Sequence, residues 1–325
     1  MPVSLRQWLN EHYEQLRDDG PKRCAMHGAY TAFLGGWYTL TSRRPIGRNV
    51  YDSDWDLLII LDACRVDVLE AVADDYEFIR DVDRVLSVGS HSREWLAGTF
   101  GRGRYAEIAD TAMITGNGHT QAVFFDDEFP PKETVPFCWP DWDVVDGDDF
   151  GHLEMVWQDD HPEGYGVPPR PITDRTIEVG REGDWDRLIA HYMQPHIPYI
   201  ADAMQEDREP TEDESRGWKR LESGDLDINT HWDLYEANLR LVLDEVELLL
   251  KNVDAERVAI TADHGNVFGE WGTYGHPEGF LHPDVRMVPW VEASAIDTSE
   301  HVPAERDHET VDTSVEEHLE ALGYA

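Results

Sequence analysis

The residues best suited to chemistry are an adjacent carboxylate and imidazole, Asp263 and His264, and a second histidine, His276, twelve positions further on. They lie in the stretch VAITADHGNVFGEWGTYGH, residues 258–276, which begins as a short β-branched and apolar run. Such a run predicts a buried strand, and ligand sites in open α/β sheets form at the carboxyl ends of strands. The stretch therefore predicts a place for a metal ion.

Two further polar clusters come directly after predicted strands. Residues 55–61 (WDLLIIL) form a near-continuous apolar run, typical of a strand buried on both faces, and this run leads into Asp62 and Arg65. Ser90 and Ser92 follow another predicted strand and precede a predicted helix. In a parallel sheet, the three clusters would converge on one edge.

Together these side chains could hold a cation and supply a nucleophile. The carboxylates of Asp62 and Asp263 and the imidazole of His264 are suitable ligands for zinc and also serve manganese. A serine hydroxyl would complete the coordination sphere. Hydrolysis of a charged ester needs a cation to neutralise the non-bridging oxygens and to lower the pKa of a hydroxyl nucleophile. A serine at a helix N-terminus also lies near free backbone N–H groups, which can hold an anionic oxygen.

Two other polar residues near strand ends have alternative roles. Arg65 could bind a substrate anion or tie its loop to a carboxylate. Asn117 follows the strand predicted at residues 111–115, and it could line the pocket or serve as a turn residue. The sequence leaves both pairs of alternatives open.

The elements that must position these residues alternate between strands and helices. This alternation predicts a single α/β domain over residues 51–325, with a central, mostly parallel sheet and helices on both faces. Residues 1–50 predict an N-terminal helical extension. Residues 126–171 carry no sustained period, which predicts an insertion or lid. Further strands are predicted at residues 82–88 and 189–193, and helices at residues 232–250 and 311–322.

The charge of the chain is extreme, with 67 acidic residues against 27 basic ones and a formal net charge of −40. A field of that sign repels phosphate backbones, so we expect no nucleic-acid partner. The acidic excess is dispersed and lysines are few, which suggests a halophilic protein from a proteome kept soluble in molar salt, as in haloarchaea. No Asp-x-Asp-x-Asp-Gly calcium loop occurs in the sequence.

Cysteine usage and the N-terminal sequence favour a reducing interior. The three cysteines have no CxxC spacing, which argues against a disulfide framework or a cysteine zinc site. The N-terminus shows no basic stretch followed by an apolar run. Residues 29–40 (AYTAFLGGWYTL) are apolar but too short to span a bilayer, so they could pack on the domain or lie on a membrane surface. We therefore expect a cytoplasmic protein, with peripheral contact at the inner membrane surface as an alternative.

The three clusters resemble those of the alkaline phosphatase and sulfatase superfamily in their order and in their placement after strands. The similarity is greatest to the branch that contains sulfatases, lipoteichoic-acid synthases and phosphoethanolamine transferases. Members open with a strand ending in an acidic metal ligand, often with an arginine three residues on, as in LDACR here. They close with Asp-His-Gly, then Gly-Glu and a histidine, as in ADHGNVFGEWGTYGH. The terminal LEALGYA is similar to the Leu-Gly-Tyr ending common among sulfatases, and the rest of the likeness covers about residues 54–276.

This resemblance implies an alkaline-phosphatase-like three-layer sandwich with one metal site. Asp62, Asp263 and His264 match the metal ligands of the family. Ser92 matches the nucleophile, which also contacts the metal, and Ser90 is the alternative nucleophile.

The resemblance also implies roles for two histidines. His196, in QPHIPY, matches a histidine that contacts the transferred group, and His276 matches a substrate-binding or second-metal histidine. Either would bind the transferred group or protonate the leaving oxygen. Two-metal phosphatases need an additional Asp and His set. Asp148 and His152 have that spacing, but they lie among many acids in the lid-like segment, so we expect a single metal.

The implied activity is metal-dependent cleavage or transfer of a phosphate-type ester, that is, a phosphomonoester, a phosphodiester or a phospho-head-group. Zinc is the expected cofactor, with manganese, magnesium or calcium as alternatives, and the substrate would be a small-molecule, glycan or lipid-head-group ester. Sulfatases mature a cysteine or serine inside Cys/Ser-x-Pro-x-Arg, and no such sequence occurs at Ser90 or Ser92. A sulfate-ester hydrolase is therefore the alternative enzyme. A non-catalytic binding or scaffold relative is the alternative of another class.

Overall fold

The computed structural model describes residues 13 and 17 and residues 20–126, 128–129 and 139–304. The helix predicted at residues 311–322 and the terminal Leu-Gly-Tyr sequence lie outside these described residues. Most of the predicted extension before residue 20 lies outside them too.

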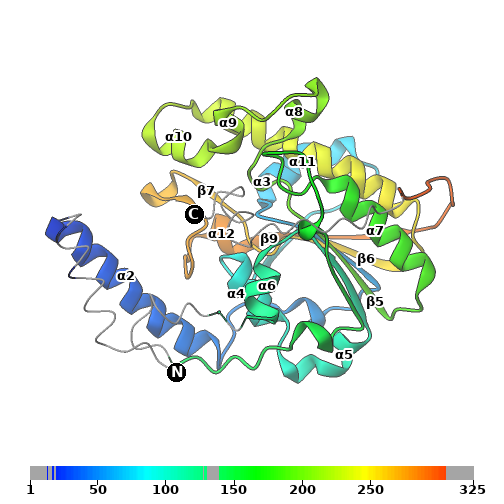
Figure 1. Cartoon of the computed structure of the whole chain (residues 1–325), viewed down its shortest axis with the longest axis horizontal. Coiled ribbons are helices and arrows are strands. Elements are labelled where there is room, and N and C mark those ends of the chain that lie inside the picture. The colour runs from blue at the N-terminus through cyan, green and yellow to red at the C-terminus, as the bar shows by residue number, and fades with distance from the viewer. Residues whose placement is uncertain (1–12, 14–16, 18–19, 127, 130–138, 305–325) are drawn as a thin grey trace.

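A seven-stranded sheet occupies the centre of the molecule (Figure 1), in the order β2-β9-β6-β1-β5-β3-β4. Five neighbouring strands, from β6 to β4, run parallel, and β9 runs antiparallel to both β6 and β2. The sheet is therefore mostly parallel, as predicted. The strands are β1 (Leu57–Leu61), β2 (Asp83–Leu86), β3 (Thr111–Thr115), β4 (His152–Met155), β5 (Arg187–Tyr192), β6 (Ala255–Thr261) and β9 (Met287–Ala295).

Helices cover both faces of the sheet and complete a three-layer α/β sandwich (Figure 1). Alternate residues of β1 point to opposite faces, so Leu57, Ile59 and Leu61 belong to one apolar cluster, and Leu58 and Ile60 to the other. The first cluster lies under α3 (Val66–Val72), α7 (Pro169–Glu182) and α11 (Ile228–Leu250). The second lies under α4 (Ser92–Thr99), α5 (Tyr105–Ala109) and α6 (His119–Phe124). The predicted fold class is confirmed.

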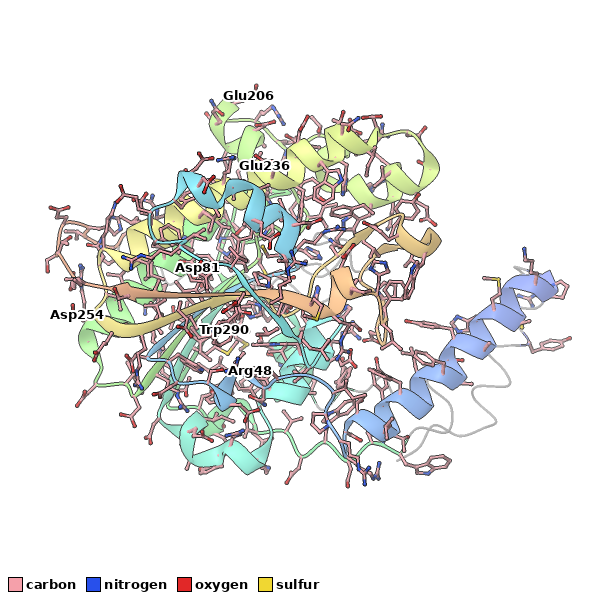
Figure 2. All side chains as sticks on the ribbon, turned by 180° about the vertical axis from the view of Figure 1, so that it is seen from behind. Arg48, Asp81, Glu206, Glu236, Asp254 and Trp290 are labelled. Atoms are coloured by element: carbon pink, nitrogen blue, oxygen red, sulfur yellow. The ribbon has the colours of Figure 1, made fainter. Side chains whose placement is uncertain are left out.

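The remaining elements lie around this sandwich. α2 (Gly20–Thr41) packs one end against the second cluster and extends away from the body (Figures 1 and 2). The charged segment between β5 and α11 folds into α8 (Ala201–Glu206), α9 (Glu212–Ser215) and α10 (Gly217–Ser223). A short hairpin, β7 (Val267–Phe268) and β8 (Tyr274–Gly275), and the single turn α12 (Pro283–Arg286) separate β6 from β9.

Two strands of the main sheet were not predicted, and each has a physical reason. β4 lies inside residues 126–171, which were predicted to be an insertion or lid, and it forms an edge of the main sheet beside β3. Its sequence, HLEM, alternates polar and apolar residues over only four positions, which is a weak strand signal. β9 contains Pro289, which cannot donate a backbone hydrogen bond and is unusual in an interior strand. Residues 127 and 130–138 of the segment predicted as a lid lie outside the described part of the chain.

Candidate metal centre

The carboxyl ends of β1 and β6 bring two carboxylates and an imidazole together. The two strands are adjacent and parallel, so Asp62, directly after β1, lies beside Asp263 and His264, just after β6. One ligand atom from each of the three lies within 4.8 Å of the others, and all three side chains are fully buried. They are three of the four residues that the sequence predicts as metal ligands, and Ser92 is the fourth.

Each carboxylate uses one oxygen for contacts within the protein and leaves the other oxygen unused. Asp62 Oδ2 accepts a hydrogen bond from Asn117 Nδ2 at 2.8 Å. Asp263 Oδ1 accepts from the backbone N–H groups of Ala63 at 3.1 Å and His264 at 2.8 Å. Asp62 Oδ1 and Asp263 Oδ2 are buried and have no hydrogen-bond partner. Buried carboxylate oxygens are costly without a partner, so a cation between them would satisfy both.

The ring of His264 directs a lone pair toward the two unpartnered carboxylate oxygens. Its Nδ1 lies 2.9 Å from the carbonyl oxygen of Gly265, which can only accept, so we assign the ring proton to Nδ1. In that tautomer the other nitrogen, Nε2, carries a lone pair that a metal ion could use. It lies 3.3 Å from Asp263 Oδ2 and 3.8 Å from Asp62 Oδ1, which are the two unpartnered oxygens. This is the usual arrangement of a metal-binding histidine with a backbone carbonyl behind it.

The electrostatics of the cluster are unfavourable without a cation. Burial, and after it the charge of Asp263, raises the pKa of Asp62 well above its usual value. Asn117 and Ser92 oppose that rise with hydrogen bonds to the carboxylate. The residues present therefore fit a divalent metal in charge, in ligand type and in their unpartnered atoms.

Ser92 places its hydroxyl at the edge of this group. It is the first residue of α4, and its Oγ lies 3.3 Å from His264 Nε2 and 3.5 Å from Asp62 Oδ2. The strand before Ser92, β2, is not a neighbour of β1 or β6, because β9 lies between β2 and β6. Ser92 therefore does not reach the site from the end of an adjacent parallel strand. A loop makes the approach instead: the Ser87 hydroxyl donates to the Asp263 carbonyl, and the Ser87 N–H donates to the Arg286 carbonyl at 2.7 Å.

Ser90 lies outside the group and holds the loop to a neighbouring segment. Its hydroxyl donates to Glu94 Oε2 at 2.8 Å and accepts from the Phe280 N–H at 3.2 Å. Glu94 is itself buried and also accepts from the Ser90 N–H at 2.8 Å. Of the two serines, Ser92 therefore has its hydroxyl at the candidate metal group.

The contacts of Arg65 favour the second of its two roles, that of tying its loop to carboxylates. The buried guanidinium donates to the carboxylates of Asp67 at 2.7 Å, Glu270 at 2.8 Å and Asp284 at 3.1 Å. It also donates to the Asn266 carbonyl at 3.1 Å. These partners fix the turn after β1 against the segment after β6. They also accept from the guanidinium N–H groups of Arg65 that would otherwise bind a substrate anion.

The predicted histidines lie against the metal group. His196 Nε2 is 3.1 Å from His276 Nε2, and the ring of His276 stacks on that of His264 with centroids 4.1 Å apart. Trp218 of α10 packs edge-on against both His196 and His276. Burial lowers the pKa of His196 to about 3 and that of His276 well below its usual value, so both rings are neutral at pH 7.

Two histidines near the site were not predicted. His91 caps α4 by accepting from the Arg93 N–H, and its ring centroid lies 5.0 Å from those of His119 and His276. Arg93 Nε donates to His119 Nδ1 at 3.1 Å. The position of His91 directly before Ser92 could have indicated that it lies near the site. No feature of the sequence around His119 indicated the same for that residue. His152, one of the weaker metal candidates, lies on β4 against Glu154 and belongs to the sheet edge.

Comparisons with known proteins found similarity in structure alone, since no protein-family model and no curated protein matches the sequence. The soluble domain of lipooligosaccharide phosphoethanolamine transferase A from Neisseria meningitidis is 16% identical, with 79% of this chain and 81% of that chain covered, at a TM-score of 0.45. The C-terminal periplasmic domain of a phosphoethanolamine transferase from Campylobacter jejuni is 14% identical (73% and 78% covered, TM-score 0.41). A putative sulfatase from Bacteroides thetaiotaomicron is also 14% identical (83% and 71% covered, TM-score 0.40).

Proposed function

We propose that the chain is a metal-dependent hydrolase or transferase that acts on a phosphate-type ester through Ser92. One arrangement supports the proposal above all: two unpartnered carboxylate oxygens, Asp62 Oδ1 and Asp263 Oδ2, lie in one buried cluster with His264 Nε2. The Ser92 hydroxyl lies 3.3 Å from that Nε2 at a helix N-terminus. A purely structural cluster would pair these buried oxygens within the protein.

Asp62, Asp263 and His264 would hold the ion, with the Ser92 hydroxyl as a further ligand. Two carboxylates, one imidazole and a hydroxyl suit zinc best, and they also serve manganese, magnesium or calcium. A divalent ion bound there would lower the pKa of the serine hydroxyl and neutralise charge on the ester oxygens.

The proposed reaction has two displacements at phosphorus. In the first, Ser92 Oγ forms a bond to phosphorus as the ester P–O bond breaks, and the leaving oxygen takes up one proton for the one that Ser92 loses. In the second, water or an acceptor alcohol forms a bond to phosphorus as the Oγ–P bond breaks, and Ser92 regains a proton. The covalent intermediate is a phosphoserine at position 92.

His276 would bind the transferred group. His196 Nδ1 lies 2.6 Å from the Ile197 carbonyl and must donate to it, so His196 Nε2 is an acceptor and His276 Nε2 is the donor between the two rings. An anionic ester oxygen would accept from His276 in place of His196. The same proton could pass to the leaving oxygen.

The test is hydrolysis of aryl phosphate esters by metal-stripped and metal-reloaded protein. We expect turnover of p-nitrophenyl phosphate or bis(p-nitrophenyl) phosphate with zinc or manganese, and loss of turnover in Ser92→Ala. Ser90→Ala is the matched control and should retain turnover, because its hydroxyl is engaged with Glu94. Unchanged turnover in Ser92→Ala would refute the proposed nucleophile. No turnover of any ester in a broad panel with either metal would favour the binding or scaffold alternative.

A further inference from the structure

The outward face of α2 is apolar along most of its length. Met26 and Leu40 are 63% and 50% exposed, while Leu34, Trp37 and Tyr38 on the opposite side are buried against the domain. Spacings of three and four residues place the exposed side chains on one side of the helix. From residue 25 to residue 40 the exposed positions are Ala25, Met26, Ala29, Tyr30, Ala32, Phe33, Gly36 and Leu40, and none of them is charged.

This helix also lies in a stretch that lacks acidic residues. Residues 20–51 contain no Asp or Glu, although about one residue in five of the whole chain is acidic. Lys22 is exposed at one end of the apolar face, and Arg43 and Arg44 are exposed just beyond the other. A surface of this composition stands out in a chain with a net charge of −40. Large apolar surfaces on soluble proteins mark interaction sites, and the charge pattern indicates an anionic partner.

We propose that the outward face of α2 rests on an anionic phospholipid surface. Its apolar side chains would enter the boundary between head groups and acyl chains, and Lys22 and Arg44 would lie among the anionic head groups. The helix projects from the body (Figures 1 and 2), which separates the contact from the acidic sandwich. Screening over about 8 Å at physiological ionic strength then limits the repulsion from the rest of the protein.

The contact would be peripheral. α2 has 22 residues and, at 1.5 Å per residue, a length of about 33 Å, but its inner face is committed to the protein core. Within the described residues, no helix is long and apolar enough to cross a membrane.

The same helix contacts the segment that carries His276. Tyr30 donates its hydroxyl hydrogen to the Glu278 carbonyl at 2.9 Å. Gly279 packs so closely on α2 that an added Cβ would lie 2.8 Å from Leu34 Cδ2 and 3.1 Å from Phe33 Cε1. Seating α2 on a membrane would therefore place one border of the candidate metal centre next to the lipid surface.

The experiment is flotation of the full chain with vesicles of phosphatidylcholine, with and without phosphatidylglycerol. We expect binding to the anionic vesicles that weakens as salt increases, and at least tenfold weaker binding in the double variant Met26→Asp/Leu40→Asp. Val302→Asp is the matched control, since Val302 is 82% exposed and distant in the chain from α2, and it should bind like the wild type. Thermal unfolding checks that both variants are folded.

Several outcomes would overturn the proposal. Absence of wild-type binding to either vesicle, or equal binding by the double variant, would exclude a lipid contact through this face. If light scattering showed a dimer that the double variant dissociates, without vesicle binding, the face would be an interface between copies. Ser92→Ala should bind vesicles like the wild type, so this test stands apart from the proposed ester chemistry.

Discussion

Asn117 donates a hydrogen bond from Nδ2 to Asp62 Oδ2 at 2.8 Å, and this contact decides which oxygen of Asp62 remains for a cation. The amide is itself fixed, because Asn117 Oδ1 accepts from the His119 N–H at 2.9 Å and the Asn117 N–H donates to Thr115 Oγ1 at 3.0 Å. β3 thus contributes to the candidate metal centre without supplying a ligand. Outer contacts of this kind orient metal ligands and tune their affinity.

Replacing Asn117 with alanine should weaken metal binding without removing a ligand. We expect the zinc affinity to fall by about 10- to 100-fold, because Asp62 would be free to rotate and its Oδ2 would lose a buried partner. Competition with a chelating dye measures the affinity. Asn229→Ala, at the exposed start of α11, should bind zinc like the wild type. Equal affinities in Asn117→Ala and wild type would show that Asp62 is held by other contacts.

Metal binding should stabilise the folded protein, because the unpartnered oxygens of Asp62 and Asp263 would gain a ligand. A ligand at 100 times its dissociation constant adds about 2.7 kcal/mol to the free energy of unfolding. We expect thermal scanning to show a higher midpoint after zinc is added to chelator-treated protein. The increase should vanish in Asp263→Asn and persist in Asp81→Asn, an exposed control. A shift of the same size in Asp263→Asn would place the metal elsewhere.

The sequence predicted that Asp62, Asp263 and His264 would meet, because each directly follows a strong strand signal. The apolar runs before Asp62 and before Asp263 and His264 become β1 and β6, and these are adjacent and parallel. Adjacent parallel strands place the residues that follow them on the same edge of the sheet, so the three side chains meet.

The sequence could not predict the contacts that depend on one side chain reaching another across the site. Whether Arg65 faced substrate or carboxylates depended on where Glu270 and Asp284 would lie, and both are more than 200 positions away along the chain. The role of Asn117 depended on the rotamer of Asp62. β2 also lies at an edge of the sheet, so a loop brings Ser92 to the site. The sequence of that loop has no hydrophobic periodicity from which its path could be predicted.

The turn after β1 depends on Tyr235. Ala63 has a left-handed backbone (φ 57°) that aims its N–H at Asp263 Oδ1. Tyr235 accepts from the Arg65 N–H at 3.0 Å and donates to the Ala63 carbonyl at 2.6 Å, which holds that turn. Tyr235→Phe would leave both backbone groups buried without a partner, so we expect a loss of about 1–3 kcal/mol in urea unfolding. Tyr105→Phe, at an exposed ring, should change stability little; a similar loss there would mean that the effect is not specific to this turn.

Ser92 should remain an ordinary serine, because the Cys/Ser-x-Pro-x-Arg sequence of sulfatases is absent around it. Protein expressed in its native host should have the intact mass encoded by the sequence, and peptide mapping should show an unmodified residue 92. Rapid quenching during ester turnover should then reveal phosphoserine at this position. A formylglycine at residue 92 would contradict the phosphate-ester proposal and favour the sulfate-ester alternative.

His276 should affect turnover and leave metal content unchanged. Its ring stacks on His264 but is not one of the three residues whose ligand atoms meet, so the wild type and His276→Ala should each bind one metal per chain. Loss of a group that binds the transferred phosphoryl or protonates the leaving oxygen typically lowers kcat by about 10²- to 10⁴-fold. His152→Ala, at the sheet edge, is the matched control and should retain full activity. Elemental analysis measures the metal content and steady-state kinetics measure the turnover. Together they distinguish a substrate-binding His276 from a His276 that binds a second metal. If the wild type binds two metals and His276→Ala binds one, His276 is a metal ligand, and a second cation takes the place assigned to the ester.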